Sequence, residues 1–171
     1  MIVWANSVQE AAPMLRLRHY VYREQRSYLP QRMDRLDLDD HDERAVHLGV
    51  RHHDHMVACC RIIYRTPYPA QEIVPDAVWQ MARSITGDAA LAELSRLTQD
   101  DTGRHEHVEA LCQAAIDHMR ASGVQWCVTL MNTTLTRLLD QHGVHAIRLA
   151  PPVELFGRRY LCLIDVTKVP S

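Results

Sequence analysis

The sequence lacks any apolar run that approaches the roughly 20 residues of a membrane-spanning helix, although 47% of its 171 residues are hydrophobic. It also lacks a basic excess, because 19 lysines and arginines face 21 acidic residues and the formal net charge is −2 at pH 7. Nucleic acids and anionic membrane surfaces are bound by basic fields, so we expect neither as a partner. Met1–Ala5 shows no basic leader and no cleavage pattern, which predicts no signal peptide and a cytoplasmic location.

The cysteines form no regular pattern that would indicate a disulfide framework. There are five of them, an odd number, on apolar segments: Cys59, Cys60, Cys112, Cys127 and Cys162. Such cysteines are typical of reduced core residues in a cytosolic protein. The 11 histidines provide no convincing four-ligand spacing with these cysteines, so we expect no metal site.

Hydrophobic periodicity predicts alternating strands and helices in a single domain over residues 1–171. The expected strands are Met1–Ala5, Ala45–Val50, Met56–Tyr64, Ala89–Thr98, Val124–Met131, Val144–Leu149 and Tyr160–Val166. The expected helices are a segment from a Ser7 N-cap to Val21, a short piece at Ala77–Ser84, His107–Ala121 and Thr133–His142.

Two connections complete this prediction. The polar turn at residues 52–55 joins the second and third strands into a hairpin, and Pro67, Pro69 and Pro75 are expected to break the chain before the short helical piece. An antiparallel first half followed by helix crossovers indicates an α+β or α/β fold, with a mixed central sheet and helices on both faces.

The stretch Glu93–Leu97 carries the strongest chemical signal. Alternation along a strand places Glu93 and Ser95 on one face and Leu94 and Arg96 on the other. A carboxylate and a guanidinium in an otherwise apolar central strand are costly unless each has a partner, and such groups are typical of active sites. A purely structural ion pair fits the same pattern, so the strand alone leaves both interpretations open.

Several motifs in a fixed order resemble the acyl-homoserine-lactone synthases, the autoinducer-making branch of the GNAT-like acyltransferase fold. Arg18 and Tyr22 are similar to the family's Arg-x-x-x-aromatic element, and Tyr28 stands where the family usually has tryptophan. The acidic run Asp37-x-Asp39-x-x-Asp42 is similar to the family's Glu-x-Asp-x-x-Asp signature, with aspartate in the leading position.

The resemblance continues along the chain. Arg61 occupies the position of the family's strand arginine, and Glu93-x-Ser95-Arg96 matches the Glu-x-Ser-Arg element. Residues 42–48 also resemble the neighbouring N-acyl amino acid synthases, which share the fold and acylate an ordinary amino acid.

The resemblance implies a GNAT-like acyltransferase fold in which the fourth and fifth strands splay apart and the pantetheine arm of the donor lies between them. It implies a fatty acyl donor on acyl carrier protein or coenzyme A and no tightly bound cofactor. The acceptor would be S-adenosylmethionine, giving an N-acyl-homoserine lactone signal for quorum sensing. The alternatives are an ordinary amino acid as acceptor, and a non-catalytic acyl-binding module of the same fold.

The resemblance also implies roles for individual residues. Glu93 is expected to act as the general base toward the attacking amine, and Ser95 to orient that base or bind the acyl carbonyl. Acceptor binding is expected of Arg18, Tyr22, Tyr28, Asp39, Asp42, Arg61 and Arg96. For the arginines, the alternative is a structural role that ties the acidic run to the sheet. For Asp39 and Asp42 the alternative is that they only solvate a loop, and for Tyr22 and Tyr28 it is packing on the helix face.

The donor side of the site is expected to be apolar. The acyl chain is predicted to contact Leu97, Val128, Thr129, Leu130, Met131 and Leu149. Gly103 and Arg104, at the turn before a helix, are predicted to contact the carrier or the pantetheine arm through free helical N–H groups. Docking of an acidic carrier protein would involve surface arginines: Arg104, Arg120, Arg158 and Arg159.

Overall fold

The computed structural model describes residues 1–170, and Ser171 lies outside the described residues. The chain divides into two compact units, the first made of Met1–Ile63 and Ser95–Ala115 and the second of Tyr64–Leu94 and the chain from Ile116 onwards. Strand β4 (Leu91–Gln99) and helix α4 (His105–Ala121) each contribute residues to both units. A single domain over residues 1–171 therefore stays a prediction.

The first unit contains the antiparallel strands β1 (Ile2–Ala5), β2 (Ala45–His52) and β3 (His55–Ile63). The β2–β3 register runs from Ala45 opposite Ile63 to His52 opposite His55. This ladder confirms the predicted hairpin and leaves residues 53 and 54 as its turn, where His53 takes a φ of 51°.

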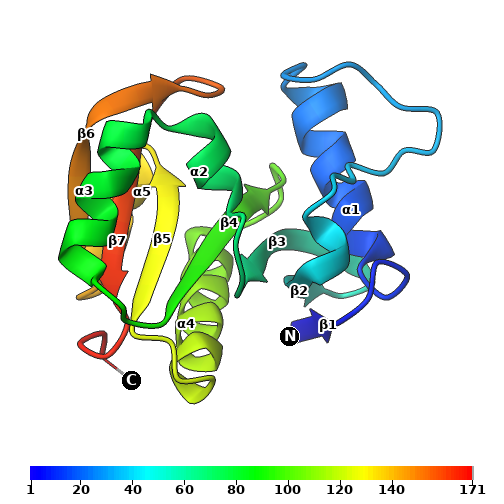
Figure 1. Cartoon of the computed structure of the whole chain (residues 1–171). Coiled ribbons are helices and arrows are strands. Elements are labelled where there is room, and N and C mark those ends of the chain that lie inside the picture. The colour runs from blue at the N-terminus through cyan, green and yellow to red at the C-terminus, as the bar shows by residue number, and fades with distance from the viewer. Residues whose placement is uncertain (171) are drawn as a thin grey trace. The chain divides into compact units, whose positions relative to one another are not determined.

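Helix α1 (Ala12–His19) packs against β3 and continues as a π-helix over Tyr20–Gln25 (Figure 1). The predicted start at a Ser7 N-cap is wrong, because the helix begins at Ala12 and Ala11 is its N-cap residue. The Ser7 hydroxyl accepts a bond from the Glu10 amide, but this bond closes a turn that precedes the helix. Pro13 lies in the first turn of the helix, where its missing N–H costs nothing. The packed face includes Met14 and Leu15, each at most 1% exposed.

The second unit contains the first residues of β4 with β5 (Trp126–Met131), β7 (Arg158–Asp165) and β6 (Ala146–Glu154). The parallel β4–β5 ladder joins Leu91–Glu93 to Trp126–Val128, and β7 pairs antiparallel with both β5 and β6. The strand order along the whole sheet is β1-β2-β3-β4-β5-β7-β6. This is the predicted mixed α+β sheet, and the short β4–β5 ladder agrees with splayed fourth and fifth strands.

Three further helices belong to the second unit: α2 (Pro69–Ile73), α3 (Asp76–Thr86) and α5 (Thr133–Gln141). Helix α3 contacts β6 (Figure 1), and Asn132 caps α5 by accepting a bond of 2.8 Å from the Leu135 amide. Helix α2 was not predicted, because Pro69 was interpreted as a chain break. Pro69 starts the helix instead, a position that its fixed φ favours.

The last predicted strand boundaries also need correction. Strand β6 was expected to end at Leu149 but runs on to Glu154, with a register shift between Leu149 and Val153. Prolines are tolerated there because β6 is an edge strand and an irregular register needs fewer ladder N–H groups.

The core follows the predicted use of cysteine. All five cysteines are buried and free, and burial raises the pKa of the Cys59 and Cys112 thiols to about 12. A raised thiol pKa favours the inert, protonated form of the thiol.

None of the helices in residues 1–170 combines the length and apolar character that a bilayer crossing requires.

Candidate acyltransfer site

Glu93 lies in the part of β4 that belongs to the second unit, and its side chain is buried, with 2% exposure. Its Oε2 accepts a hydrogen bond of 2.9 Å from the backbone N–H of Ala70, in the first turn of α2. The unpredicted helix α2 therefore fixes the orientation of the carboxylate on which the predicted chemistry depends.

The first unit holds a continuous ion-pair cluster, here called the arginine–aspartate network. Its members come from α1, the π-helix, the irregular segment before β2, β3 and β4. They are Arg18, Arg23, Asp37, Asp39, Asp42, Arg61 and Arg96. The network joins four arginines to three aspartates that are far apart in the sequence, so it fixes the irregular segment against helix and sheet.

The centre of the network is fully buried. Asp42 accepts bonds of 2.7 Å from Arg18 Nη1 and 2.8 Å from Arg61 Nη1, and a third of 2.8 Å from the backbone N–H of Asp39. Arg18, Asp42 and Arg61 are each 1% exposed. Their polar groups are thus occupied by one another, which is the structural role left open for Arg18 and Arg61. The burial of Asp42 contradicts the alternative that it only solvates a loop.

The outer side of the network is partly open to solvent. The side chains of Asp39 and Arg96 are 26% and 23% exposed, and Arg96 Nη2 donates to Asp39 Oδ2 at 2.8 Å. The Arg96 guanidinium lies 5.6 Å from the centre of the Tyr22 ring, within cation–π range. Tyr28 adds a second ring, 6.5 Å from Tyr22. One carboxylate, one guanidinium and two rings therefore meet at an accessible position.

Charge compensation controls the ionisation of the three aspartates. Burial alone would raise the pKa of each carboxyl group, but the neighbouring arginines outweigh it. Arg18 and Arg61 lower the pKa of Asp42. Arg61 and Arg96 lower the pKa of Asp39. Arg18, Arg96 and Arg23 lower the pKa of Asp37 in the same way. All three carboxylates are therefore ionised at neutral pH.

This ionisation predicts acid sensitivity of folding. Since the folded-state pKa values of Asp37, Asp39 and Asp42 lie below the ordinary value of 3.8, their stabilisation is present above that value and is lost as pH falls toward the folded-state values. We expect the urea unfolding midpoint to be nearly flat from about pH 7 to pH 5 and to fall below about pH 4. A midpoint that stayed constant down to about pH 3 would contradict the network's role.

Arg96 interrupts the regular alternation expected for Glu93–Leu97. It takes a φ of 55°, in the left-handed region, so the simple two-face pattern does not hold beyond Ser95. The Ser95 hydroxyl accepts a bond of 3.0 Å from Arg61 Nε. Ser95 thus belongs to the surroundings of the network, and the backbone turn at Arg96 directs its side chain to Asp39 and Tyr22.

The predicted acyl contacts are distributed over both faces of β5. Alternation places Val128 and Leu130 on one face and Thr129 and Met131 on the other, and Val128 and Met131 are at most 1% exposed. An acyl chain that touched all four would have to pass the edge of β5. Leu149 on β6 is also buried, at 4% exposure, and Leu97 on β4 is half-buried.

The predicted donor contacts occupy the turn before α4. Gly103 allows close packing of the Gln99 side chain, because a Cβ there would lie 2.3 Å from Gln99 Cγ. Gln99 in turn donates to the Arg104 carbonyl at 2.8 Å, and the Arg104 side chain is exposed.

The other predicted docking arginines differ in availability. Arg120 donates to the Val166 and Val169 carbonyls at 3.0 and 2.6 Å, so it anchors the C-terminal segment. Arg158 is exposed and Arg159 half-buried on β7.

Sequence reasoning missed several residues of the site. Arg23 binds Asp37 at 2.8 Å, the Thr98 hydroxyl lies 2.8 Å from Tyr22 Oη, and His47 Nε2 donates to the Asp42 carbonyl at 3.1 Å. Burial lowers the pKa of His47, which favours the neutral ring beneath the network. Only Arg23 had a sequence signal, its place one turn beyond Arg18 on the same helical segment.

In residues 1–170, no three His, Cys, Asp or Glu side chains are grouped to hold a metal ion.

Comparison with known proteins identifies the family and the fold of this chain. Residues 17–113 match the acetyltransferase (GNAT) domain family, whereas no curated protein gives a match. TofI, solved in a ternary complex with an inhibitor and MTA, is similar in fold, with a TM-score of 0.77 and 22% identity over 99% of this chain and 94% of that chain.

Two further solved structures share the fold. BjaI, a CoA-dependent acyl-homoserine lactone synthase solved with SAM and isopentyl-CoA, has a TM-score of 0.76 and 19% identity over 97% of this chain and 83% of its own. FeeM, an N-acyl amino acid synthase from uncultured soil microbes, has a TM-score of 0.71 and 11% identity over 98% and 90%. The matched segment spans more than half of the sequence, and the chain therefore belongs to the acetyltransferase (GNAT) domain family of acyltransferases.

Proposed function

We propose that the chain transfers a fatty acyl group from a thioester to the amine of S-adenosylmethionine and produces an N-acyl-homoserine lactone. The observation that carries this proposal is the open side of the arginine–aspartate network, where Asp39 and Arg96 pair at 2.8 Å beside Tyr22. The similarity in fold to BjaI, which was solved with SAM and isopentyl-CoA, supports the same substrate classes.

The acceptor contacts follow from charge. An amino acid group carries an ammonium and a carboxylate, and the paired Asp39 and Arg96 present the complementary charges at one place. Arg96 can bind the carboxylate at two points, and Asp39 suits the cationic part. Tyr22 and Tyr28 provide aromatic faces for the adenine or the sulfonium. The positions of Asp39 and Arg96 are then fixed by the buried part of the network, which is formed by Arg18, Arg61 and Asp42.

The chemistry requires a free amine. An α-amino group has a solution pKa near 8, so much of it is protonated and not nucleophilic at neutral pH. In our proposal Glu93 accepts that proton, the nitrogen attacks the thioester carbonyl, and the thiol of the pantetheine arm leaves. The acceptor's carboxylate oxygen then attacks the carbon beside the sulfonium, so that the carbon–sulfur bond breaks, methylthioadenosine leaves and the lactone ring closes.

An ordinary amino acid is the second candidate acceptor. The same pair of Asp39 and Arg96 would recognise its ammonium and carboxylate, and the fold is also similar to FeeM, an N-acyl amino acid synthase. Such an acceptor has no sulfonium leaving group, so its product would stay open. The two functions therefore differ in product and share the acyl transfer step.

The product distinguishes the two functions. We expect the purified chain, given an acyl thioester on carrier protein or coenzyme A, to form acyl-homoserine lactone with S-adenosylmethionine and little product with a mixture of the 20 common amino acids. Liquid chromatography with mass spectrometry separates the two products. Open N-acyl amino acids as the main product would favour the second function, and no N-acyl product from either acceptor would reject both.

A further inference from the structure

The second unit contains a cavity whose lining residues have no role in the proposed reaction. It has a volume of about 480 Å³ and is lined by Tyr64, Thr66, Tyr68, Gln71, Trp79, Arg83, Ala89, Ala90, Leu91, Ser122 and Val124. All of these residues belong to the second unit, and none is among the residues assigned above to acyl transfer. Small-molecule sites commonly have volumes of about 300–1,000 Å³, so the cavity has room for a small ligand.

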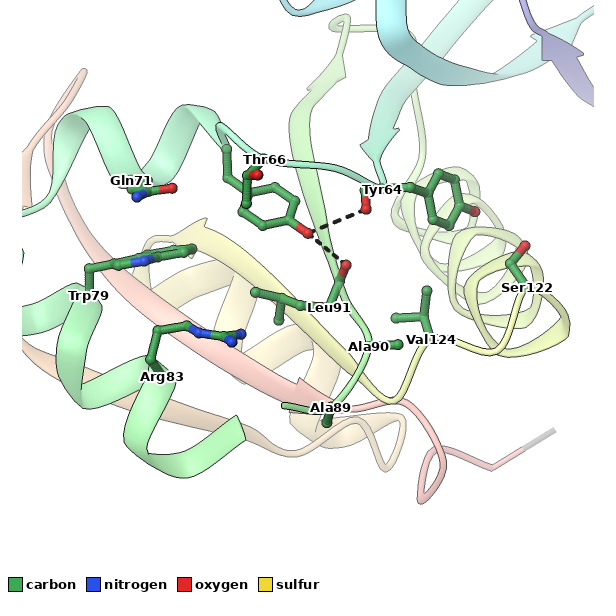
Figure 2. A pocket seen from close by; sticks show the side chains of 11 residues that line it. Tyr64, Thr66, Gln71, Trp79, Arg83, Ala89, Ala90, Leu91, Ser122 and Val124 are labelled. Atoms are coloured by element: carbon green, nitrogen blue, oxygen red, sulfur yellow. Dashed lines mark hydrogen bonds between the residues drawn. The ribbon is translucent and has the colours of Figure 1, made fainter. Parts of the chain in front are cut away.

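Aromatic and small apolar side chains form most of the wall. The rings of Tyr68 and Trp79 lie 5.9 Å apart at 43°, and both residues are less than 8% exposed. The Tyr68 hydroxyl donates to the Leu91 carbonyl at 2.8 Å, and Figure 2 shows this bond as a dashed line. Because this bond fixes the Tyr68 ring before any ligand arrives, the aromatic wall is preorganised for a flat apolar group.

A single charged side chain lines the cavity. Arg83 extends from α3 on the same side as Trp79, with its guanidinium directed toward Leu91 (Figure 2). Within residues 1–170 the Arg83 guanidinium has no hydrogen bond or ion pair, in contrast to the four arginines of the network. Tyr64 and Ser122 lie toward the opposite end of the cavity, where they add hydroxyl groups.

We propose that this cavity is a separate binding site for a small aromatic carboxylate, with the ring packed on Tyr68 and Trp79 and the carboxylate bound by Arg83. A guanidinium matches a carboxylate through two parallel hydrogen bonds, and one unpaired cation balances one negative charge. Apolar walls on either side would shield that pair from water and strengthen it. A neutral aromatic ligand would leave the guanidinium without a partner.

Titration calorimetry with two matched probes tests this site on the full chain. Phenylacetate carries the ring and the charge, whereas phenylacetamide carries the ring without the charge. We expect saturable binding of one phenylacetate, at least about 10-fold tighter than phenylacetamide, which corresponds to about 1.4 kcal/mol. Arg83→Gln is expected to abolish the preference, whereas Arg137→Gln, an exposed arginine on α5 outside the cavity, is expected to retain it.

Several outcomes would overturn the proposal. They are no saturable binding of phenylacetate, equal affinity for the two probes, or a preference that survives Arg83→Gln. A Trp79→Phe variant locates the site, because its fluorescence should no longer respond to phenylacetate if Trp79 forms the wall. Should Arg83→Gln fail to fold, Arg83→Lys takes its place, because lysine keeps the charge and is expected to keep a weaker preference for phenylacetate over phenylacetamide. A Trp79→Ala chain is expected to lose all binding of both probes, which completes the test.

Discussion

Replacing Glu93 by glutamine is expected to lower kcat for acyl transfer by about 100- to 10,000-fold, the range lost when a general base is removed. The substitution separates chemistry from structure. A glutamine carbonyl can still accept the 2.9 Å bond from the Ala70 amide, so α2 should stay in place and the unfolding midpoint should change little. Only the capacity to accept the amine's proton is lost.

Thiol release from the acyl thioester measures this effect, with circular dichroism as the check on folding. Glu72→Gln is the matched control, since Glu72 is an exposed residue of α2, the helix whose Ala70 amide binds Glu93, and its substitution should leave kcat unchanged. A folded Glu93→Gln chain with undiminished turnover would remove Glu93 from the role of base.

The second large effect concerns stability. Asp42→Asn is expected to reduce the free energy of unfolding by about 3–5 kcal/mol, the cost of breaking a buried ion pair. The reason is that Asp42 accepts bonds from both Arg18 and Arg61 in a site where all three residues are 1% exposed. Removing its charge leaves two buried guanidiniums with too little negative charge around them. Each kcal/mol corresponds to about 2–4 °C in Tm for a chain of this length.

Urea denaturation at neutral pH gives the comparison, with Asp34→Asn as the control. Asp34 forms an ion pair of similar length, 2.7 Å with Arg32, but both side chains are more than 40% exposed. Exposed pairs contribute little to stability, so the control should unfold close to wild type. An Asp42→Asn chain that also unfolded close to wild type would show that the buried network does not stabilise the first unit.

The element order was readable from the sequence because strands and helices here carry clear apolar periods. The hairpin at residues 45–63 and the helix before Gly123 were predicted within a few residues. The errors fall where proline decides the backbone. Pro69 was interpreted as a chain break, yet it lies in the first turn of α2, a position that differs from a chain break only through tertiary packing.

For the site, the sequence predicted which residues take part but not which of them pair with one another. Sequence motifs pointed to Arg18, Asp42, Arg61 and Arg96 without distinguishing a buried anchor from an accessible ligand. Burial makes that distinction, since Arg61 is 1% exposed and the Arg96 side chain 23%. The φ of 55° at Arg96 has no local signal either, because arginine does not favour the left-handed region.

One measurement tests the central claim most directly: the rate of thiol release by the purified wild-type chain with and without S-adenosylmethionine, with the acylated product quantified in the same samples. We predict that thiol release depends on S-adenosylmethionine and equals lactone formation mole for mole. Thiol release at the same rate without any amine acceptor, with free fatty acid as the product, would contradict the account.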